Sequence, residues 1–398
     1  MIGRVLGLVG AGVGGAAIGV LVMATAQGPD RPDDESAPAT TEPARVAPLP
    51  DGADVLLVWT PRVLDPTLPT TARGLPGVEV VSEVAAGLTN LVVSQDSDGD
   101  VVDRPEPGWS IPLDTVAIDP AAHAQLASVA DRGTVASLGP GQALLGRTSA
   151  ALRRLDAGGS LQLATGATLQ VSGIVEDATI GAAELAVDRA TGAAIGVTAP
   201  RYVLLAHDGD RATVESALRS ALPTDAPVRF RGLGETTYLR HGDAVLPQVK
   251  IKERFGEFAY KPPPPGEREF QQDPVWQSEN LVNSDMPLLG QMRCHRAVVD
   301  AVRGALTEIE AANLGDLIDP EGFAGCWNPR LVVADGADVS HHAWGVALDV
   351  NYSANPTGRE SLQDPRLVEI FQQWGFTWGG NWLVTDPAHF EYVRPPDA

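Results

Sequence analysis

Residues 340–349 read SHHAWGVALD, and residues 386–391 read DPAHFE. In pattern form the first stretch is S-x-H-x-x-G-x-A-x-D and the second begins D-x-x-H. Together they supply imidazoles and carboxylates in the combination that a catalytic zinc site uses, which is three protein ligands, one open position and a nearby base. These two stretches therefore decide how the C-terminal third of the chain is interpreted.

The first stretch predicts a short strand. Positions 346–350 alternate, so the larger apolar side chains would face a core while Ala347 and Asp349 face the other way. Gly345 permits a tight bend before this strand, which would let His342 fold back beside Asp349.

The second stretch also predicts a strand, in which His389 and Glu391 share one face. Phe390 and Tyr392 share the other face, which favours contact with a core. The proline that follows Asp386 biases this aspartate towards an extended conformation, so that the chain can turn and present both Asp386 and His389 at one place.

These motifs resemble those of a zinc peptidase family. That family includes D-alanyl-D-alanine carboxypeptidases and dipeptidases and the phage L-alanyl-D-glutamate endopeptidases, within the wider group of lysostaphin and hedgehog folds. The resemblance covers about residues 281 to 393. It implies a zinc-dependent metallopeptidase that hydrolyses a bond in peptidoglycan stem peptides. A non-catalytic cell-wall-binding or scaffold protein with a structural zinc is the alternative.

The resemblance also implies roles for individual residues. His342, Asp349 and His389 would be the zinc ligands. Asp386 would be the general base for a water that attacks the peptide carbonyl, and Glu391 is the alternative base. The spacing to Gly345 and Asp349 selects His342 over its neighbour His341, which is expected to face elsewhere. His123, His207 and His295 are interpreted as structural or surface residues.

Further residues would contact the substrate. Arg330, in the run GCWNPR, matches the family's substrate-binding arginine and would stabilise the developing oxyanion. Ser340 and Trp382 are expected to line the cleft. Residues 378–382 read WGGNW and resemble the WGGDW element of the L-alanyl-D-glutamate branch, with Asn381 in place of the aspartate. L-Ala-D-Glu is therefore the favoured bond, and D-Ala-D-Ala stays possible.

Composition limits the other possibilities. The chain has 398 residues and a formal net charge of −22, which argues against a nucleic-acid partner because phosphate contacts need clustered Lys and Arg. Its two cysteines, Cys294 and Cys326, predict a disulfide in an exported protein. A cysteine ligand to zinc is the competing interpretation.

The N-terminus predicts an extracytoplasmic protein. Arg4 precedes an apolar run at 5–26 that is long enough to span a bilayer and ends in Ala-Thr-Ala. Residues 1–26 are thus a single membrane anchor, or a signal peptide cleaved after Ala26. Residues 27–50, rich in Pro, Asp, Glu and Thr, predict a disordered linker. The charge on either side of the run places the rest of the chain outside the cytoplasm.

The remaining chain predicts an α+β fold class with two folded parts. Residues 52–240 form a separate α+β domain that binds a partner in the envelope or serves only as a spacer. Within it, 143–175 resembles the extracytoplasmic domain of FtsX/MacB-type ABC permeases. Residues 241–280 form a Pro-rich connector, in which the four prolines at 262–265 exclude helix and central strand. Residues 281–398 form the zinc domain.

Several elements are expected at defined positions. These are strands at 53–59 and 77–83, a helix at 119–131, a hairpin at 160–175, a strand, helix and strand within 201–232, and helices at 295–313 and 364–375 that end at Gly315 and Gly375.

Overall fold

A computed structural model describes residues 54–61, 63–332 and 338–394. The predicted membrane segment at 1–26 and the linker at 27–50 lie outside these residues. Within the described ranges, none of the helices combines the length and the apolar character that crossing a bilayer requires.

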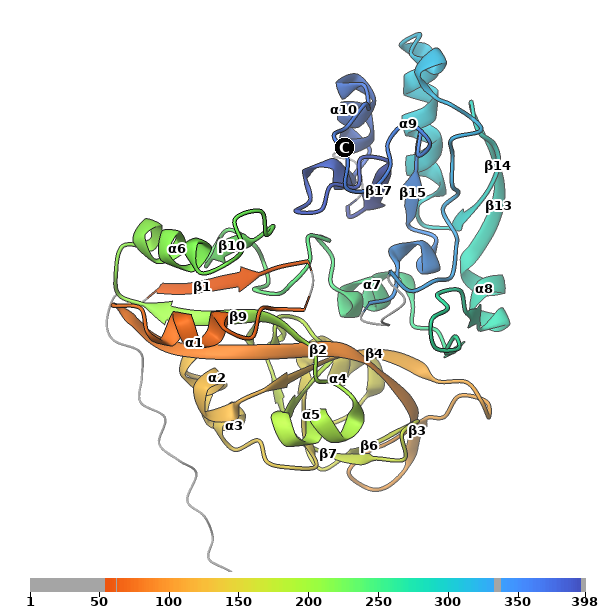
Figure 1. Ribbon diagram of the computed structural model, residues 1–398. Coiled ribbons are helices and arrows are strands. Elements are labelled where there is room, and N and C mark those ends of the chain that lie inside the picture. Colours follow the sequence, from red (N-terminus) through yellow and green to blue (C-terminus); the bar gives the residue numbers. More distant parts are fainter. Residues whose placement is uncertain (1–53, 62, 333–337, 395–398) are drawn as a thin grey trace, which may run out of the picture. The chain divides into compact units, whose positions relative to one another are not determined.

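A ten-stranded sheet organises the first part of the described chain (Figure 1). Its path is β10-β1-β9-β2-β4-β8-β5-β7-β6, and β3 pairs with β2. The long strand β2 also pairs with β6, so six strands close into a ring. The strands are β1 (Asp54–Trp59), β2 (Val78–Gln95), β3 (Val101–Asp103), β4 (Ile111–Ile118), β5 (Gln142–Gly146), β6 (Ser160–Leu163), β7 (Thr168–Val175), β8 (Leu185–Asp188), β9 (Pro200–His207) and β10 (Arg229–Gly232).

Short helices accompany this sheet. They are α1 (Leu68–Arg73), α2 (Pro120–Leu126), α3 (Arg132–Ala136), α4 (Arg147–Arg153), η1 (Asp177–Ile180), α5 (Arg189–Ile195) and α6 (Arg211–Ser220). The predicted first strand, the 160–175 hairpin and the strand, helix and strand of 201–232 are confirmed. The strand predicted at 77–83 is too short, because β2 continues to Gln95.

The helix predicted at 119–131 is too long. It begins as expected, since the Asp119 side chain accepts hydrogen bonds from the first-turn N–H groups. It ends at Leu126, where Ala127 becomes extended. The Ser128 hydroxyl accepts a hydrogen bond from the Asp131 N–H at 3.2 Å and starts a separate turn. Local side-chain bonding of this kind competes with helix continuation.

The helix α7 (Gln248–Phe255) carries a buried ionic network within the segment that was predicted as a connector. Lys252 Nζ lies 2.8 Å from both Glu184 and Glu257. Arg153 Nη2 lies 2.9 Å from Glu184 and 2.6 Å from Glu257. Each buried charge has opposite charges beside it, which removes the large penalty of an unpaired buried ion. The network joins α7 to α4 and to the loop that precedes β8.

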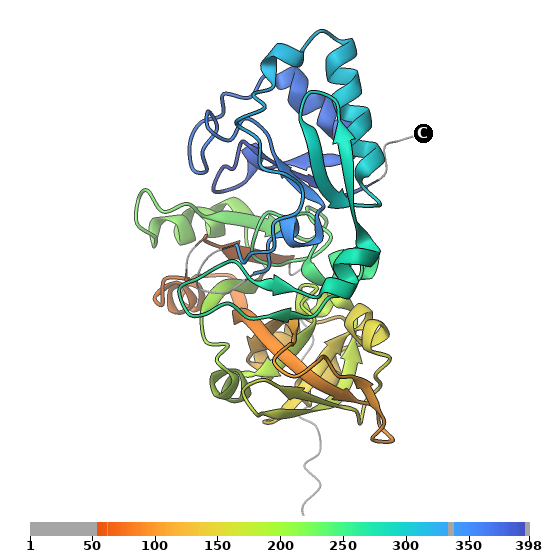
Figure 2. The same ribbon diagram turned by 90° about the vertical axis from the view of Figure 1, so that its right-hand side faces the viewer.

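The C-terminal part contains a hairpin, a three-stranded antiparallel sheet and several helices. Figures 1 and 2 show the helices α9 (Val299–Ala311) and α10 (Pro365–Gln373) side by side. The small sheet has the order β15-β17-β16. The elements are β11 (Tyr260–Lys261), β12 (Gln271–Gln272), α8 (Pro274–Asn280), β13 (Leu281–Met286), β14 (Gly290–His295), α9 (Val299–Ala311), η2 (Gly315–Leu317), η3 (His341–Trp344), β15 (Ala347–Asp349), α10 (Pro365–Gln373), β16 (Phe376–Trp378), η4 (Gly379–Asn381) and β17 (His389–Tyr392).

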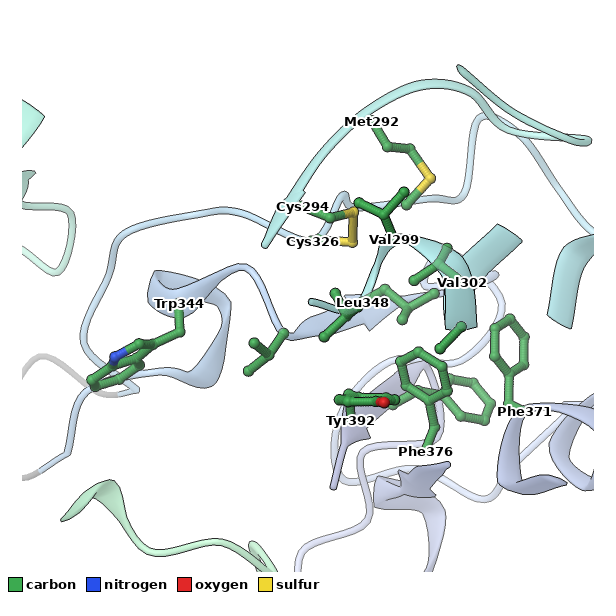
Figure 3. Close-up of a cluster of buried hydrophobic side chains, with 14 of the residues drawn as sticks. Met292, Cys294, Val299, Val302, Cys326, Trp344, Leu348, Phe371, Phe376 and Tyr392 are labelled. Carbon is green, nitrogen blue, oxygen red and sulfur yellow. A yellow bond between two sulfur atoms is a disulfide. The ribbon is translucent and has the colours of Figure 1, made fainter. Parts of the chain in front are cut away.

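One apolar core supports these elements (Figure 3). Leu348 of β15 and Phe371 of α10 are fully buried in it, and Tyr392 of β17 is nearly so. Aromatic residues of the predicted connector, including Phe255 and Phe258, belong to the same core. This segment therefore packs against a folded part of the chain. The prolines at 262–265 lie outside helix and strand, as predicted.

Helix α10 begins and stops where its sequence indicates. Asp364 accepts a hydrogen bond from the Arg366 N–H at 2.9 Å. Gly375 has φ +90°, and a Cβ there would come within 1.8 Å of the Arg394 carbonyl oxygen. Helix α9 instead ends before the predicted Gly315. Asn313, with φ +57°, provides the left-handed turn, and the Leu314 N–H bonds back to the carbonyl of Ile309.

The predicted disulfide is present. The sulfurs of Cys294 and Cys326 are 2.07 Å apart and both residues are fully buried. The bond closes a loop between positions separated by 32 residues, which stabilises the fold by about 3–4 kcal/mol in the chain-entropy treatment. It anchors the segment that leads to Arg330, and it excludes these cysteines as metal ligands in this state.

Candidate metal centre

Two adjacent strands and one short helix position the three predicted metal ligands. Asp349 ends β15 and His389 begins β17, and these two residues are direct partners in the antiparallel pairing. Residues that lie opposite each other on adjacent strands bring their side chains together on one face of the sheet. His342 lies in η3, which the left-handed Gly345 (φ +70°) turns back towards β15.

The three side chains converge on one point. Asp349 Oδ1 lies 2.8 Å from His389 Nδ1 and 3.3 Å from His342 Nε2. The two ring nitrogens are 3.3 Å apart. Tetrahedral zinc with bonds of about 2.0–2.1 Å separates its ligand atoms by about 3.3 Å. The donor set and its spacing therefore fit a zinc ion.

Neighbouring acceptors fix the orientation of both imidazoles. His342 Nδ1 donates to the Gly325 carbonyl at 3.2 Å, and His389 Nε2 donates to Glu391 Oε1 at 3.1 Å. The outer nitrogens are thereby occupied, so that the inner nitrogens can offer lone pairs to a cation. His341 does not enter the cluster. Its Nδ1 lies 2.9 Å from the same Glu391 oxygen.

The electrostatics also favour a cation at this point. Although burial opposes ionisation, hydrogen bonds with the two histidines hold the pKa of Asp349 far below its usual range. Burial likewise opposes the charge on Glu391, but His341 and His389 lower its pKa. Burial disfavours His389 as an imidazolium, yet hydrogen bonds with Asp349 and Glu391 raise its pKa to about 10. A metal ion would supply the positive charge that this proton otherwise provides.

Asp386 lies beside the cluster rather than within it. Its Oδ1 accepts a hydrogen bond from Thr357 Oγ1 at 3.0 Å, and its carbonyl accepts one from the His389 N–H at 3.0 Å. Burial raises the pKa of Asp386, and the nearby His389 opposes this shift. Two cavities, of about 530 and 430 Å³, both reach this residue. A carboxyl group with a raised pKa that lines two cavities can exchange protons with a molecule bound there.

The predicted substrate residues lie around the same point. Arg330 Nη2 is 4.0 Å from Asp349 Oδ2, and burial lowers the pKa of its guanidinium. Ser340 lines the larger cavity, and its N–H bonds to the Arg330 carbonyl at 3.0 Å. The Trp382 ring lies 5.1 Å from that of His389. The structure thus brings together every residue that the sequence assigned to this site.

The loop that carries Trp382 is held by the part of the chain that contains the ten-stranded sheet and the loop after β10. This part, residues 54–247, is called the first sheet region. Arg229 Nη2 donates to the Asn381 carbonyl at 3.2 Å, and Asp243 Oδ2 accepts from the Leu383 N–H at 2.6 Å. Asp243 is nearly buried and pairs with both Arg229 and Arg231. Neither these contacts nor the hydrogen bonds of Thr357 and the Gly325 carbonyl follow from any pattern in the sequence.

Glu391→Gln tests the outer hydrogen bond to His389. The amide keeps the shape of the side chain but loses its charge, so zinc affinity is expected to fall by about 10–100-fold while the fold is kept. Competition with a chromogenic chelator measures this change. Glu369→Gln, at an exposed position of α10, is the matched control and should leave zinc affinity unchanged. Equal affinities for the two variants would show that Glu391 does not support the site.

Two solved structures and one family model are similar to parts of this chain. No curated protein matches it. The periplasmic region of MacB from Actinobacillus actinomycetemcomitans is 11% identical, with a TM-score of 0.32, over 45% of this chain and 89% of that one. The extracellular domain of the noncanonic ABC-type transporter YknZ from Gram-positive bacteria is 11% identical, with a TM-score of 0.29, over 45% of this chain and 100% of that one.

The family model matches the C-terminal region. A family model described as D-alanyl-D-alanine carboxypeptidase matches residues 334–392, which contain His342, Asp349, Asp386 and His389. This match confirms the family resemblance of the two motifs and supports a peptidase in this region, so residues 334–392 are similar to the D-alanyl-D-alanine carboxypeptidase family.

Proposed function

We propose that this chain is a zinc-dependent metallopeptidase that hydrolyses a peptide bond in peptidoglycan stem peptides. The observation that carries the proposal is the convergence of His342, Asp349 and His389 within a region that matches a carboxypeptidase family. L-Ala-D-Glu is the favoured bond because of the WGGNW run, and D-Ala-D-Ala is the other candidate.

The chain's own residues would divide the chemistry between them. When bound, zinc supplies the Lewis acidity that polarises the peptide carbonyl and makes water acidic enough to react near neutral pH. Asp386 accepts the proton of the attacking water and passes it to the leaving amine. Arg330 stabilises the negative charge that develops on the carbonyl oxygen. Ser340 and Trp382 line the cavity in which the peptide lies.

We also propose that the chain acts outside the cytoplasm, attached by its N-terminal segment or secreted after cleavage. This proposal rests on the sequence of residues 1–50 alone. An envelope partner of residues 52–240 stays a prediction.

Digestion of purified peptidoglycan by the full-length chain tests the function. Mass spectrometry of the released fragments separates cleavage at L-Ala-D-Glu, which exposes a glutamate amine, from loss of a terminal D-Ala. Chelation should stop release and added zinc should restore it. A chain that holds zinc but releases nothing would favour the scaffold with a structural zinc.

A further inference from the structure

The larger cavity at the metal centre continues into the first sheet region. Its volume is about 530 Å³. One end is lined by residues of the candidate catalytic site, and the other by residues that lie far earlier in the sequence. The lining residues that matter are Asp386, His389 and Glu391 at the metal end and Trp59, Arg240 and His241 at the far end.

Two hydrogen-bond donors at the far end have no partner among the residues that the structure describes. Trp59 Nε1 and Arg240 Nη1 are buried, and neither is hydrogen-bonded to any described residue. Both atoms carry hydrogens and no lone pair that could accept, so only an acceptor can satisfy them. Buried donors are normally paired, so each of these two needs an explanation, and the residues that carry them both line the cavity. A ligand rich in oxygen would supply the acceptors that Trp59 and Arg240 lack.

The charges around these donors do not replace the missing acceptor. Arg201 and Arg240 line this end, and Asp338 lies beside them with His241 Nε2 at 3.7 Å from its Oδ2. Asp114, which is buried nearby, also interacts with Arg240. Among the described residues at this end, two arginines lie near two aspartates, so neither sign of charge dominates there. Recognition there depends on directed hydrogen bonds rather than on a positive field.

Trp59 and Arg240, at the far end of the cavity, are held in place relative to the metal site. Trp59 is the last residue of β1, which pairs with both β9 and β10. Arg240 follows β10 and lies three residues before Asp243. Asp243 binds the Leu383 N–H, next to Trp382 in the cavity lining. The same contacts therefore position the catalytic loop and the far end of the cavity.

We infer that Trp59 and Arg240 bind a carboxylate of the peptide substrate and so form a subsite that residues 281–398 alone lack. This inference rests on the proposed function. Both candidate bonds supply such a group, because L-Ala-D-Glu contains a glutamate and D-Ala-D-Ala ends in a free carboxylate. An arginine guanidinium and an indole N–H are suitable donors for the two oxygens of one carboxylate. The first sheet region thus takes part in substrate selection.

Binding of matched peptides tests the subsite. The full-length, zinc-loaded chain with Asp386→Asn to prevent turnover is titrated by calorimetry with a synthetic stem pentapeptide. Versions of the peptide in which each carboxylate in turn is a carboxamide are titrated in parallel. One amidation is expected to weaken binding about 10-fold or more, as the loss of a charged hydrogen-bonded pair does. Arg240→Gln should abolish this difference, and Trp59→Phe should reduce it.

Arg189→Gln is the matched control. Arg189 lies on the same sheet region, pairs with Glu83 and does not line the cavity. Thermal unfolding midpoints show whether each variant is folded. If Arg240→Gln is unfolded, Trp59→Phe still tests the subsite, because phenylalanine keeps most of the buried aromatic ring. If both cavity variants discriminate between acid and amide as the control does, the subsite is wrong while the peptidase proposal stands. If the unsubstituted chain neither binds nor cuts stem peptides, both proposals fail.

Discussion

His342→Ala is expected to remove bound zinc and, with it, hydrolysis. The imidazole supplies one of three converging donor atoms, 3.3 Å from each of the other two. Two remaining donors cannot hold the ion as a three-ligand site does. Zinc affinity should therefore fall by well over about 100-fold, beyond the range seen when only a ligand's hydrogen-bond partner is lost. Metal content after dialysis and release of stem-peptide fragments measure the two effects.

The adjacent histidine provides the control. His341 is a histidine in the same short helix, but its ring bonds to Glu391 outside the cluster. His341→Ala should keep zinc, with at most about a 10-fold loss of affinity because Glu391 loses one of its two partners. If His341→Ala lost the metal and His342→Ala retained it, the assignment of ligands within the pair would be reversed.

The sequence was sufficient for the local geometry of this site. Alternation at 346–350 predicted which side chains enter the core, and Val346, Leu348 and Val350 are all buried. The permissive Gly345 predicted the turn that returns His342 to Asp349. Both predictions depend on the period of a strand and on the conformational freedom of one residue, which are properties of a few consecutive positions.

The pairing of the two motifs could not be derived in the same way. Asp349 and His389 are 40 residues apart, and nothing in either stretch sets the register that places them opposite each other. The family resemblance supplied this association. The Gly325 carbonyl and Thr357 were missed because a backbone acceptor and a lone threonine have no pattern in sequence.

The burial of charged side chains could not be predicted from the sequence either. The helix α7 reads QVKIKERF, which looks like an exposed amphipathic helix. Lys252 is nevertheless buried, because Glu184, 68 residues earlier, and Glu257 surround its ammonium. Contacts between distant segments decide such cases, and they also brought Trp59 and Arg240 to the cavity of the metal site.

Asp386→Asn is expected to lower kcat by about 10²–10⁴-fold while leaving zinc bound. The asparagine keeps the size of the side chain and an oxygen that can accept from Thr357 Oγ1, so the local structure should persist. It cannot accept the proton of the attacking water, and loss of a general base has an effect of this size. Zinc content should match that of the unsubstituted chain, because Asp386 lies outside the His342, Asp349 and His389 cluster.

The comparison with Glu391 makes the result decisive. Glu391→Gln should weaken zinc binding, and at saturating zinc it should recover most of its kcat, because Glu391 acts through the outer nitrogen of His389. Asp386→Asn should not recover at any zinc concentration. Steady-state hydrolysis of a stem peptide across a zinc titration separates the two behaviours. If Asp386→Asn kept full kcat and zinc-saturated Glu391→Gln lost it, Glu391 would be the base, and Asp386 would serve only to shape the junction of the two cavities.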